Sequence, residues 1–266
     1  MLASLTSAPA QTAGVTRFVR FSHRGQTAHA VQEGEELRVI QGDMLGAYKV
    51  TSKKLKLSEV KLLYPITPSK VLAVGLNYKS HLGNRTPPPQ PEIFYKPITC
   101  LQNPADPIRI PRDAKNVHYE GELVVVIGKR LSRVSKDEAT AGIFGVTCGN
   151  DVSERDWQNG AQKDLQWWRA KGADTFGPMG PAIVKGLNYG KLQLETRLNG
   201  KSVQKQLTSD LLFDCPTIVS YVSQYVTLEP GDVIYTGTPG STQKMSPGDV
   251  VEVEIEGIGI LKSTVA

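Results

Sequence analysis

The feature that most constrains the fold of this chain is an apolar run at residues 123–127, which Gly128 closes and Glu120-Gly121-Glu122 precedes. Such a run of branched apolar side chains before a glycine predicts a buried strand. Successive side chains alternate across a strand, so Glu120 and Glu122 project from the same face. Two neighbouring carboxylates repel each other unless a cation or a proton lies between them. The pattern therefore indicates either a cation site or an ordinary solvated strand edge.

A third carboxylate, Asp151, follows a second apolar stretch at residues 143–147. Together with Glu120 and Glu122 it would provide three hard oxygen ligands, which Mg²⁺, Mn²⁺ and Ca²⁺ prefer over the ligands typical of zinc. The three residues are thus candidate metal ligands, and the sequence does not choose among the three ions.

Short apolar strands separated by Gly, Pro and Asn dominate the chain from residue 70 onward. We predict strands at 71–75, 123–127, 144–148, 192–198, 233–236 and 250–255, and helices at 136–141, 155–162 and 215–225. Asp214 is the expected N-cap of the last helix, and Asn199-Gly200 is a strong hairpin signal. The pattern predicts a mostly β architecture with peripheral helices, an α+β fold.

The N-terminal part has a different organisation. Alternating residues at 16–21 and 27–31 predict a hairpin, and a further strand is expected at 37–40. We therefore expect a disordered leader over residues 1–15 and a small β-rich domain over 16–64. A linker with two prolines begins at Tyr64 and leads into the remaining domain, 65–266. Because three arginines precede the first acidic residue, Glu33, a mitochondrial transit peptide is an alternative interpretation of the start.

Composition excludes several function classes. The 266 residues carry a formal net charge of +5, and the basic residues are scattered, which argues against nucleic-acid binding. No apolar run reaches the length of a membrane span. The three cysteines are widely spaced and odd in number, so they fit neither a disulfide framework nor a zinc knuckle. A reducing compartment, the cytoplasm, is the predicted location.

Several motifs in a fixed order resemble the fumarylacetoacetate hydrolase family. The matching pieces are VGLNY at 74–78 followed by His81, FYKP at 94–97, YEGEL at 119–123, GNDVSERDWQ at 149–158, KGADT at 171–175, GPMGP at 177–181, TGTP at 236–239 and PGDVV at 247–251. The resemblance covers residues 16–264 and implies the mixed β-sandwich roll of that family, a homodimer, and an enzyme acting on a small 2-oxo or diketo acid.

The resemblance also implies roles for single residues. Glu120, Glu122 and Asp151 correspond to the metal ligands, and Lys171 to a catalytic lysine that stabilises negative charge. Four further positions correspond to substrate contacts: Tyr78, Gln158, Thr175 and Thr238. His81 corresponds to a general base on a mobile lid, a role that suits an imidazole titrating near neutral pH.

The lid departs from the family pattern. Relatives that are hydrolases or lyases carry a Glu about one helical turn after the histidine, whereas this chain has Asn84 three residues after His81. Gly83 and the prolines at 87–89 argue against a regular lid helix. Without a carboxylate partner an imidazole is less basic, which weakens the case for an activated water.

Three functions therefore remain open. The first is a Mg²⁺-dependent hydrolase that cleaves a C–C bond of an acylpyruvate or related diketo acid through a metal-stabilised enolate. The second is a lyase or isomerase, either an oxaloacetate decarboxylase or a keto–enol tautomerase of a small 2-oxo diacid, which the missing Glu favours. The third is a catalytically weak relative that serves as a binding protein. The sequence ranks the hydrolase slightly first.

Overall fold

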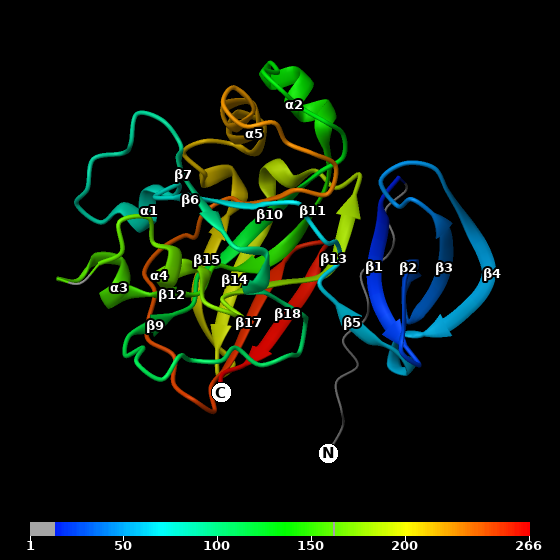
Figure 1. Ribbon diagram of the computed structural model, residues 1–266, viewed down its shortest axis with the longest axis horizontal. Coiled ribbons are helices and arrows are strands. Elements are labelled where there is room, and N and C mark those ends of the chain that lie inside the picture. Colours follow the sequence, from blue (N-terminus) through cyan, green and yellow to red (C-terminus); the bar gives the residue numbers. More distant parts are fainter. Residues whose placement is uncertain (1–13, 162) are drawn as a thin grey trace.

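The computed structural model describes residues 14–161 and 163–266. The predicted leader, residues 1–15, therefore lies almost wholly outside the described residues, as does the last residue of the helix expected at 155–162. In the described part, strands are the dominant regular structure, and a few short helices lie at the periphery (Figure 1). The predicted fold class, mostly β with peripheral helices, is confirmed.

Two sheets contain all but two of the strands in the described residues. The larger has twelve strands in the order β4-β3-β2-β1-β13-β11-β10-β16-β6-β7, with β5 paired to β1 and β8 paired to β13. The smaller has four strands in the order β15-β14-β17-β18, and β9 and β12 form a separate pair. The first strands are β1 (Thr16–His23), β2 (Gln26–Glu33), β3 (Glu36–Gly42), β4 (Tyr48–Lys56), β5 (Lys61–Leu63), β6 (Val71–Gly75), β7 (Glu92–Lys96), β8 (Leu101–Gln102) and β9 (Val117–His118).

The remaining strands are β10 (Gly121–Ile127), β11 (Ile143–Asn150), β12 (Ser153–Glu154), β13 (Gly177–Lys185), β14 (Gln193–Leu198), β15 (Lys201–Leu207), β16 (Val233–Tyr235), β17 (Val250–Ile255) and β18 (Gly259–Thr264). The α-helices are α1 (Lys79–Leu82), α2 (Lys136–Gly142), α3 (Arg155–Asn159), α4 (Trp168–Gly172) and α5 (Cys215–Ser223), and four short 3₁₀ turns complete the list.

Strand β10 explains why its sequence is a continuous apolar run. Leu123, Val125 and Ile127 enter one core, which the smaller sheet and α5 cover. Val124 and Val126 face the opposite way and enter a second core, which also contains Phe18 of β1. Because both faces are buried, alternation of apolar and polar residues is lost, as expected for a central strand.

The predicted strands and helices are confirmed to within a few residues, and two of them match closely. The strands predicted at 71–75 and 250–255 coincide with β6 and β17. Asn199 and Gly200 adopt positive φ angles of 52° and 78° between β14 and β15, as a tight hairpin turn requires. Asp214 caps α5 by accepting a hydrogen bond from the Thr217 N–H at 2.9 Å. The helix predicted at 215–225 ends earlier than expected, at Ser223. Tyr225 lies beyond its end and is 76 % exposed.

Strand β13 is the main element that the sequence did not predict. Its sequence contains Pro178 and Pro181, and proline normally marks edges and bulges because it cannot donate to a neighbouring strand. Here it lies between β1 and β11, and its register against β11 shifts between Val146 and Cys148. Residues 16–64 therefore continue the same sheet as the rest of the chain, while the boundary predicted at residue 65 stays a prediction.

Candidate metal centre

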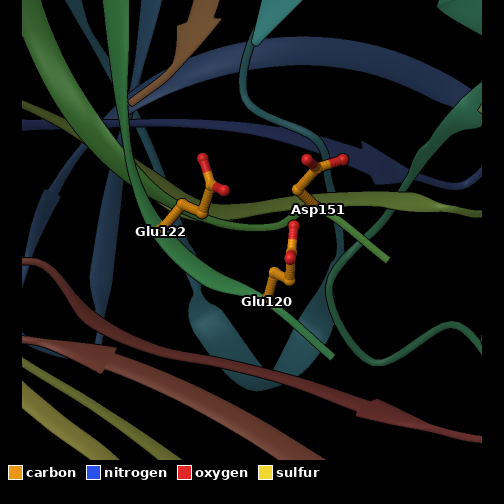
Figure 2. A group of neighbouring side chains, drawn as sticks. All are labelled: Glu120, Glu122 and Asp151. Atoms are coloured by element: carbon orange, nitrogen blue, oxygen red, sulfur yellow. The ribbon is translucent and has the colours of Figure 1, made fainter. Parts of the chain in front are cut away.

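The three predicted ligand carboxylates lie together. Carboxylate oxygens of Glu120, Glu122 and Asp151 are all within 4.8 Å of one another, and all three residues are buried. Figure 2 shows the side chains of Glu120, Glu122 and Asp151 grouped together around the start of β10. Whether a metal ion fits here is decided by the chemistry of these donors and of their surroundings.

The pairing of β10 with β11 brings the carboxylates together. Gly121 lies opposite Asn150 in the register, so the start of one strand meets the end of the other. Asn150 Oδ1 accepts from the Glu120 N–H at 2.8 Å, and the Asp151 N–H donates to the Glu120 carbonyl at 2.8 Å. These hydrogen bonds hold the backbone of Glu120 and Asp151 in place relative to each other.

Gly121 separates the two glutamates for a steric reason. A Cβ at this position would lie 2.0 Å from Thr196 Oγ1 on β14 and 3.3 Å from Gln204 Oε1 on β15. The smaller sheet approaches so closely here that only glycine fits. The Glu-Gly-Glu pattern thus combines one face that carries the carboxylates with another that contacts the second sheet.

Three cations surround the cluster. Arg155 Nη2 donates to Glu120 Oε1 at 2.5 Å, and Lys171 Nζ bonds both Glu120 Oε2 and, at 2.8 Å, Asp151 Oδ2. Lys96 Nζ donates to Asp151 Oδ1 at 2.6 Å and also to the carbonyl of Lys171. Lys96 therefore orients one candidate ligand and the segment that holds Lys171. Burial lowers the pKa of its ammonium, but the combined attraction of Asp151, Cys100 and Glu122 outweighs burial, so the pKa is raised.

Glu122 differs from the other two carboxylates. Within the described residues no cation forms an ion pair with it, and its contact is the Gly237 N–H at 2.7 Å. Burial, together with the charges of Asp151 and Glu120, raises the pKa of Glu122 well above its usual value. For Glu120 burial acts in the same direction, but the charges of Arg155 and Lys171 outweigh it and hold the pKa well below the usual range. The donor set fits a divalent ion, since such an ion would balance the charge on Glu122.

His81 approaches the cluster from α1. Its Nε2 lies 3.7 Å from Glu120 Oε1, and its Nδ1 lies 2.6 Å from the Gly240 carbonyl oxygen. A carbonyl oxygen can only accept, so Nδ1 carries the proton and Nε2 keeps its lone pair facing the carboxylates. Burial lowers the pKa of His81, and this effect exceeds the opposing attraction of Glu120. The imidazole is therefore neutral near pH 7 and able to accept a proton.

A reciprocal contact, which we call the lid clasp, holds α1 against the loop after β16. His81 donates to the Gly240 carbonyl, and the Gly240 N–H donates to Ser80 Oγ at 3.0 Å. Gly240 has a φ of +60°, a conformation that favours glycine. The helix α1 is a single turn that ends before Gly83, whose φ is +59°. The sequence predicts no regular helix in this segment. The clasp therefore fixes the orientation of the imidazole through its Nδ1 side.

A cavity of about 280 Å³ lies beside the cluster. Most predicted site residues line it, namely His81, Glu120, Glu122, Gln158, Lys171 and Thr238. Gln158 accepts from Arg155 Nη1 at 2.7 Å, and Thr238 donates to the Gly121 carbonyl at 2.9 Å. Two of the three candidate ligands, Glu120 and Glu122, thus line the cavity, whereas Asp151 does not.

Two predicted substrate contacts are not brought to this cavity. Tyr78 is fully buried, forms a bridge to Leu211 and does not line the cavity, and burial raises the pKa of its phenol. Thr175 accepts from the Arg109 N–H at 2.8 Å and lies beside a separate surface hollow. Its positive φ of 71° turns the side chain in that direction, which the sequence motif alone did not indicate.

Arg155 is a site residue that the sequence reasoning did not single out. Besides Glu120 and Gln158 it contacts Thr242 Oγ1 at 2.8 Å, and Thr242 also lines the cavity. Its position, four residues after Asp151 and three before Gln158, was the signal available. An exposed arginine is so common that the spacing carried little weight until the neighbours were known.

The comparisons with known proteins decide the family. The family model described as fumarylacetoacetate (FAA) hydrolase C-terminal matches residues 70–266, and one described as Rv2993c-like, N-terminal matches residues 16–65. The chain belongs to the fumarylacetoacetate hydrolase family. The resemblance stated from the motifs is confirmed.

Relatives span most of this chain. Protein Rv2993c of Mycobacterium tuberculosis is 45% identical, covering 86% of this chain and 87% of its own. The mitochondrial oxaloacetate tautomerase FAHD2A of Bos taurus is 40% identical, with coverages of 77% and 69%.

Within the described residues, no helix is long and apolar enough to cross a membrane.

Two solved structures are similar over nearly the whole chain. The 2-hydroxyhepta-2,4-diene-1,7-dioate isomerase of Mycobacterium marinum has a TM-score of 0.88 and 41% identity, covering 94% of this chain and 98% of that one. A fumarylacetoacetate hydrolase of Exiguobacterium antarcticum has a TM-score of 0.85 and 32% identity, with coverages of 94% and 99%. The family thus includes proteins named as isomerases, tautomerases and hydrolases.

Proposed function

We propose that this protein is a divalent-metal-dependent enzyme that interconverts the keto and enol forms of a small 2-oxo acid. The observation that carries the proposal is the state of His81, a neutral imidazole whose unprotonated Nε2 faces the carboxylate cluster at 3.7 Å from Glu120. The ten residues after His81, 82–91, contain no carboxylate that could assist it. One base of this kind suits a single proton transfer better than activation of water.

The residues divide the chemistry among them. A divalent ion held by Glu120, Glu122 and Asp151 would supply Lewis-acid polarisation of the substrate's keto group. His81 Nε2 accepts a proton from the carbon next to that group and returns it to reverse the reaction. The Lys171 ammonium lies within the cluster and stabilises negative charge that develops on the substrate oxygen. Arg155 fixes one oxygen of Glu120 and one of Gln158, which keeps the cavity wall in place.

The named relatives support this assignment over hydrolysis. The bovine relative is named as an oxaloacetate tautomerase, and the structure from M. marinum as an isomerase of a dioate. Both reactions move a proton without breaking a C–C bond. This moves the ranking from the hydrolase, which the sequence placed slightly first, to the isomerase.

The test is the rate of ketonisation of enol-oxaloacetate, followed by ultraviolet absorbance with Mg²⁺ and with EDTA. We expect metal-dependent acceleration by the native protein and loss of it in His81→Gln. Proton NMR of the products checks whether pyruvate also forms, which would indicate decarboxylation. An enol decay unchanged by the protein would contradict the proposal.

A second candidate is cleavage of a C–C bond in an acylpyruvate, and the similarity to the hydrolase from E. antarcticum favours it. Acetate and pyruvate formed from acetylpyruvate, in a metal-dependent reaction, would identify this activity. The variant Asn84→Glu restores the carboxylate at the position where hydrolytic relatives carry one. A gain of acetylpyruvate cleavage in this variant would show that the missing partner limits hydrolysis, and no gain would remove that argument.

We further propose Mg²⁺ as the ion, with Mn²⁺ and Ca²⁺ as alternatives, because all donors are carboxylate oxygens. The three cysteines are free and buried, which supports the cytoplasm as the compartment. Thermal unfolding of the EDTA-treated protein with each ion added separately tests the choice of metal. The preferred ion should raise the melting temperature most at equal concentration.

A homodimer is the proposed assembly. Tyr95, Ile98, Leu165 and Trp168 are exposed apolar side chains that line one groove beside β7. Contiguous apolar surface of this kind is typical of an interface. Sedimentation velocity of the native protein and of Trp168→Glu tests it, since the variant should shift the protein toward the monomer.

A further inference from the structure

Arg85 lies just beyond α1 and lines the cavity beside the carboxylate cluster. Its Nε donates to the Leu82 carbonyl and its Nη2 to the His81 carbonyl, both at 3.0 Å. These two bonds hold the guanidinium against the end of the lid turn. Its Nη1 group and the second proton of Nη2 remain available as donors. Within the part of the chain that the structure describes, no carboxylate forms an ion pair with Arg85.

The charges around the cavity show what is left for Arg85 to bind. Lys96, Lys171 and Arg155 pair with Glu120 and Asp151, and their three positive charges equal in number the negative charges of the carboxylate cluster. A divalent ion at the cluster then makes the cavity positive, and Arg85 adds a further positive charge. A substrate with one carboxylate offsets part of this excess, whereas a second carboxylate offsets more of it.

The size of the cavity limits how long such a substrate can be. At about 280 Å³ it lies at the lower end of the range of ligand pockets, roughly 300–1,000 Å³. A planar guanidinium with donors on two neighbouring nitrogens is well suited to a carboxylate. The carboxylate it contacts would be the one remote from the metal, because Arg85 makes no contact with the ligand residues.

We propose that Arg85 is a specificity residue that binds the second carboxylate of the substrate, so that the substrate class is a short 2-oxo dicarboxylic acid. This assignment rests on the proposed function, because it takes the first carboxylate and the keto group to bind at the cluster. The proposed base, His81, and the residue that binds the far carboxylate, Arg85, then lie four residues apart in the same segment.

The experiment compares two 2-hydroxy acids that cannot enolise, malate and 2-hydroxybutyrate, by calorimetric titration with Mg²⁺ present. The two acids have the same length and differ in having a carboxylate or a methyl group at the fourth carbon. The native protein should bind malate at least about tenfold more tightly, as a charge-assisted hydrogen bond predicts. Arg85→Gln should lose this preference, while its affinity for 2-hydroxybutyrate should change by less than about twofold.

Two further variants separate the effect of the charge of Arg85 from that of its paired donors and provide a control arginine. Arg85→Lys keeps the charge without the paired donors and should retain part of the preference for malate. Arg112→Gln removes an exposed arginine that does not line this cavity and should behave as the native protein. Equal binding of the two acids by the native protein, binding of neither, or a preference that survives in Arg85→Gln would overturn the assignment. A malate preference that depends on Arg85, in a protein without tautomerase activity, would refute the proposed function and leave the carboxylate site standing.

Discussion

At the scale of single residues, Glu120 and Glu122 of the candidate centre differ in the groups that contact their carboxylates. Glu120 contacts Arg155 and Lys171, so its charge is compensated inside the protein. Glu122, two residues later in β10, accepts a hydrogen bond from a backbone N–H. The same side chain therefore has a lowered pKa at one position and a raised pKa at the other. This asymmetry makes metal binding and protonation of Glu122 competing events.

The competition predicts how stability depends on pH in the metal-free protein. Because the folded-state pKa of Glu122 is raised, its contribution to stability is fully present below the usual pKa of 4.5 and is lost as pH rises through the folded pKa. Mg²⁺ replaces the proton, so the stabilisation it provides should grow over the same pH range. Calorimetric melting temperatures with EDTA and with Mg²⁺, between pH 5 and pH 8, measure both effects.

Glu122→Gln is the control, because an amide of nearly the same shape does not titrate. This variant should lose the pH dependence due to this residue together with the Mg²⁺-induced rise in melting temperature. It should also lose activity, since a ligand is missing. Activity that persists in Glu122→Gln would show that the assignment of this carboxylate is wrong.

His81 gives a second prediction at the residue scale. His81→Gln should lower turnover by about 10²–10⁴-fold, the usual contribution of a general base. Mg²⁺ affinity should stay near the native value, because the imidazole lies beside the ligand set and is not part of it. Turnover and calorimetric Mg²⁺ binding are measured on the same sample. An equal loss of metal binding would place His81 among the ligands instead.

At the scale of elements, the lid clasp joins two segments far apart in sequence. The turn α1 and the loop at Gly240 meet through Ser80 and His81. The same loop contains Gly237, whose N–H donates to Glu122. His81 and the candidate ligand Glu122 therefore contact a common stretch of backbone. Any change in this loop should affect the two together.

Ser80→Ala tests the clasp without touching the base. Removing one net hydrogen bond, worth about 0.5–1.5 kcal/mol, should lower kcat roughly 2- to 10-fold by loosening the lid. KM should change little, because Ser80 does not line the cavity. Ser80→Thr, which keeps the hydroxyl, should restore kcat, and Lys79→Ala on the same turn is the matched control. A Ser80→Ala variant with native kcat would show that the clasp does not position His81.

At the scale of the whole molecule, one sheet joins the N-terminal strands to the strands that carry the ligands (Figure 1). β1 pairs with β13, and Arg17 donates to the carbonyls of Gly257 and Ile258 at 2.8 and 2.5 Å. Phe18 is fully buried and contacts both Tyr48 of β4 and Phe144 of β11. The core is therefore shared across the predicted boundary at residue 65, and we expect the two parts to unfold together.

Phe18→Ala tests this coupling. Loss of a buried aromatic ring should cost about 3–5 kcal/mol of unfolding free energy. At roughly 2–4 °C per kcal/mol for a chain of this size, the melting temperature should fall by about 10 °C. The three tryptophans of the chain all lie at residues 157–168, so tryptophan fluorescence reports on the unfolding of the C-terminal part alone. A fluorescence transition that stays in place while calorimetry shows an earlier one would demonstrate independent unfolding.

The sequence by itself determined the family, the β-rich class and the candidate ligands, because the apolar run of β10 and its flanking carboxylates are local patterns. It also showed that residues 82–91, which follow His81, contain no carboxylate. Tertiary structure decided what holds the imidazole, since Gly240 lies 159 residues from His81 along the chain and meets it only through the fold. It likewise decided that Arg155 and Arg85 face the cavity and Thr175 does not. Local sequence fixes the alternation of side chains along a strand, but the pairing of distant strands and loops decides which charged groups share one buried space.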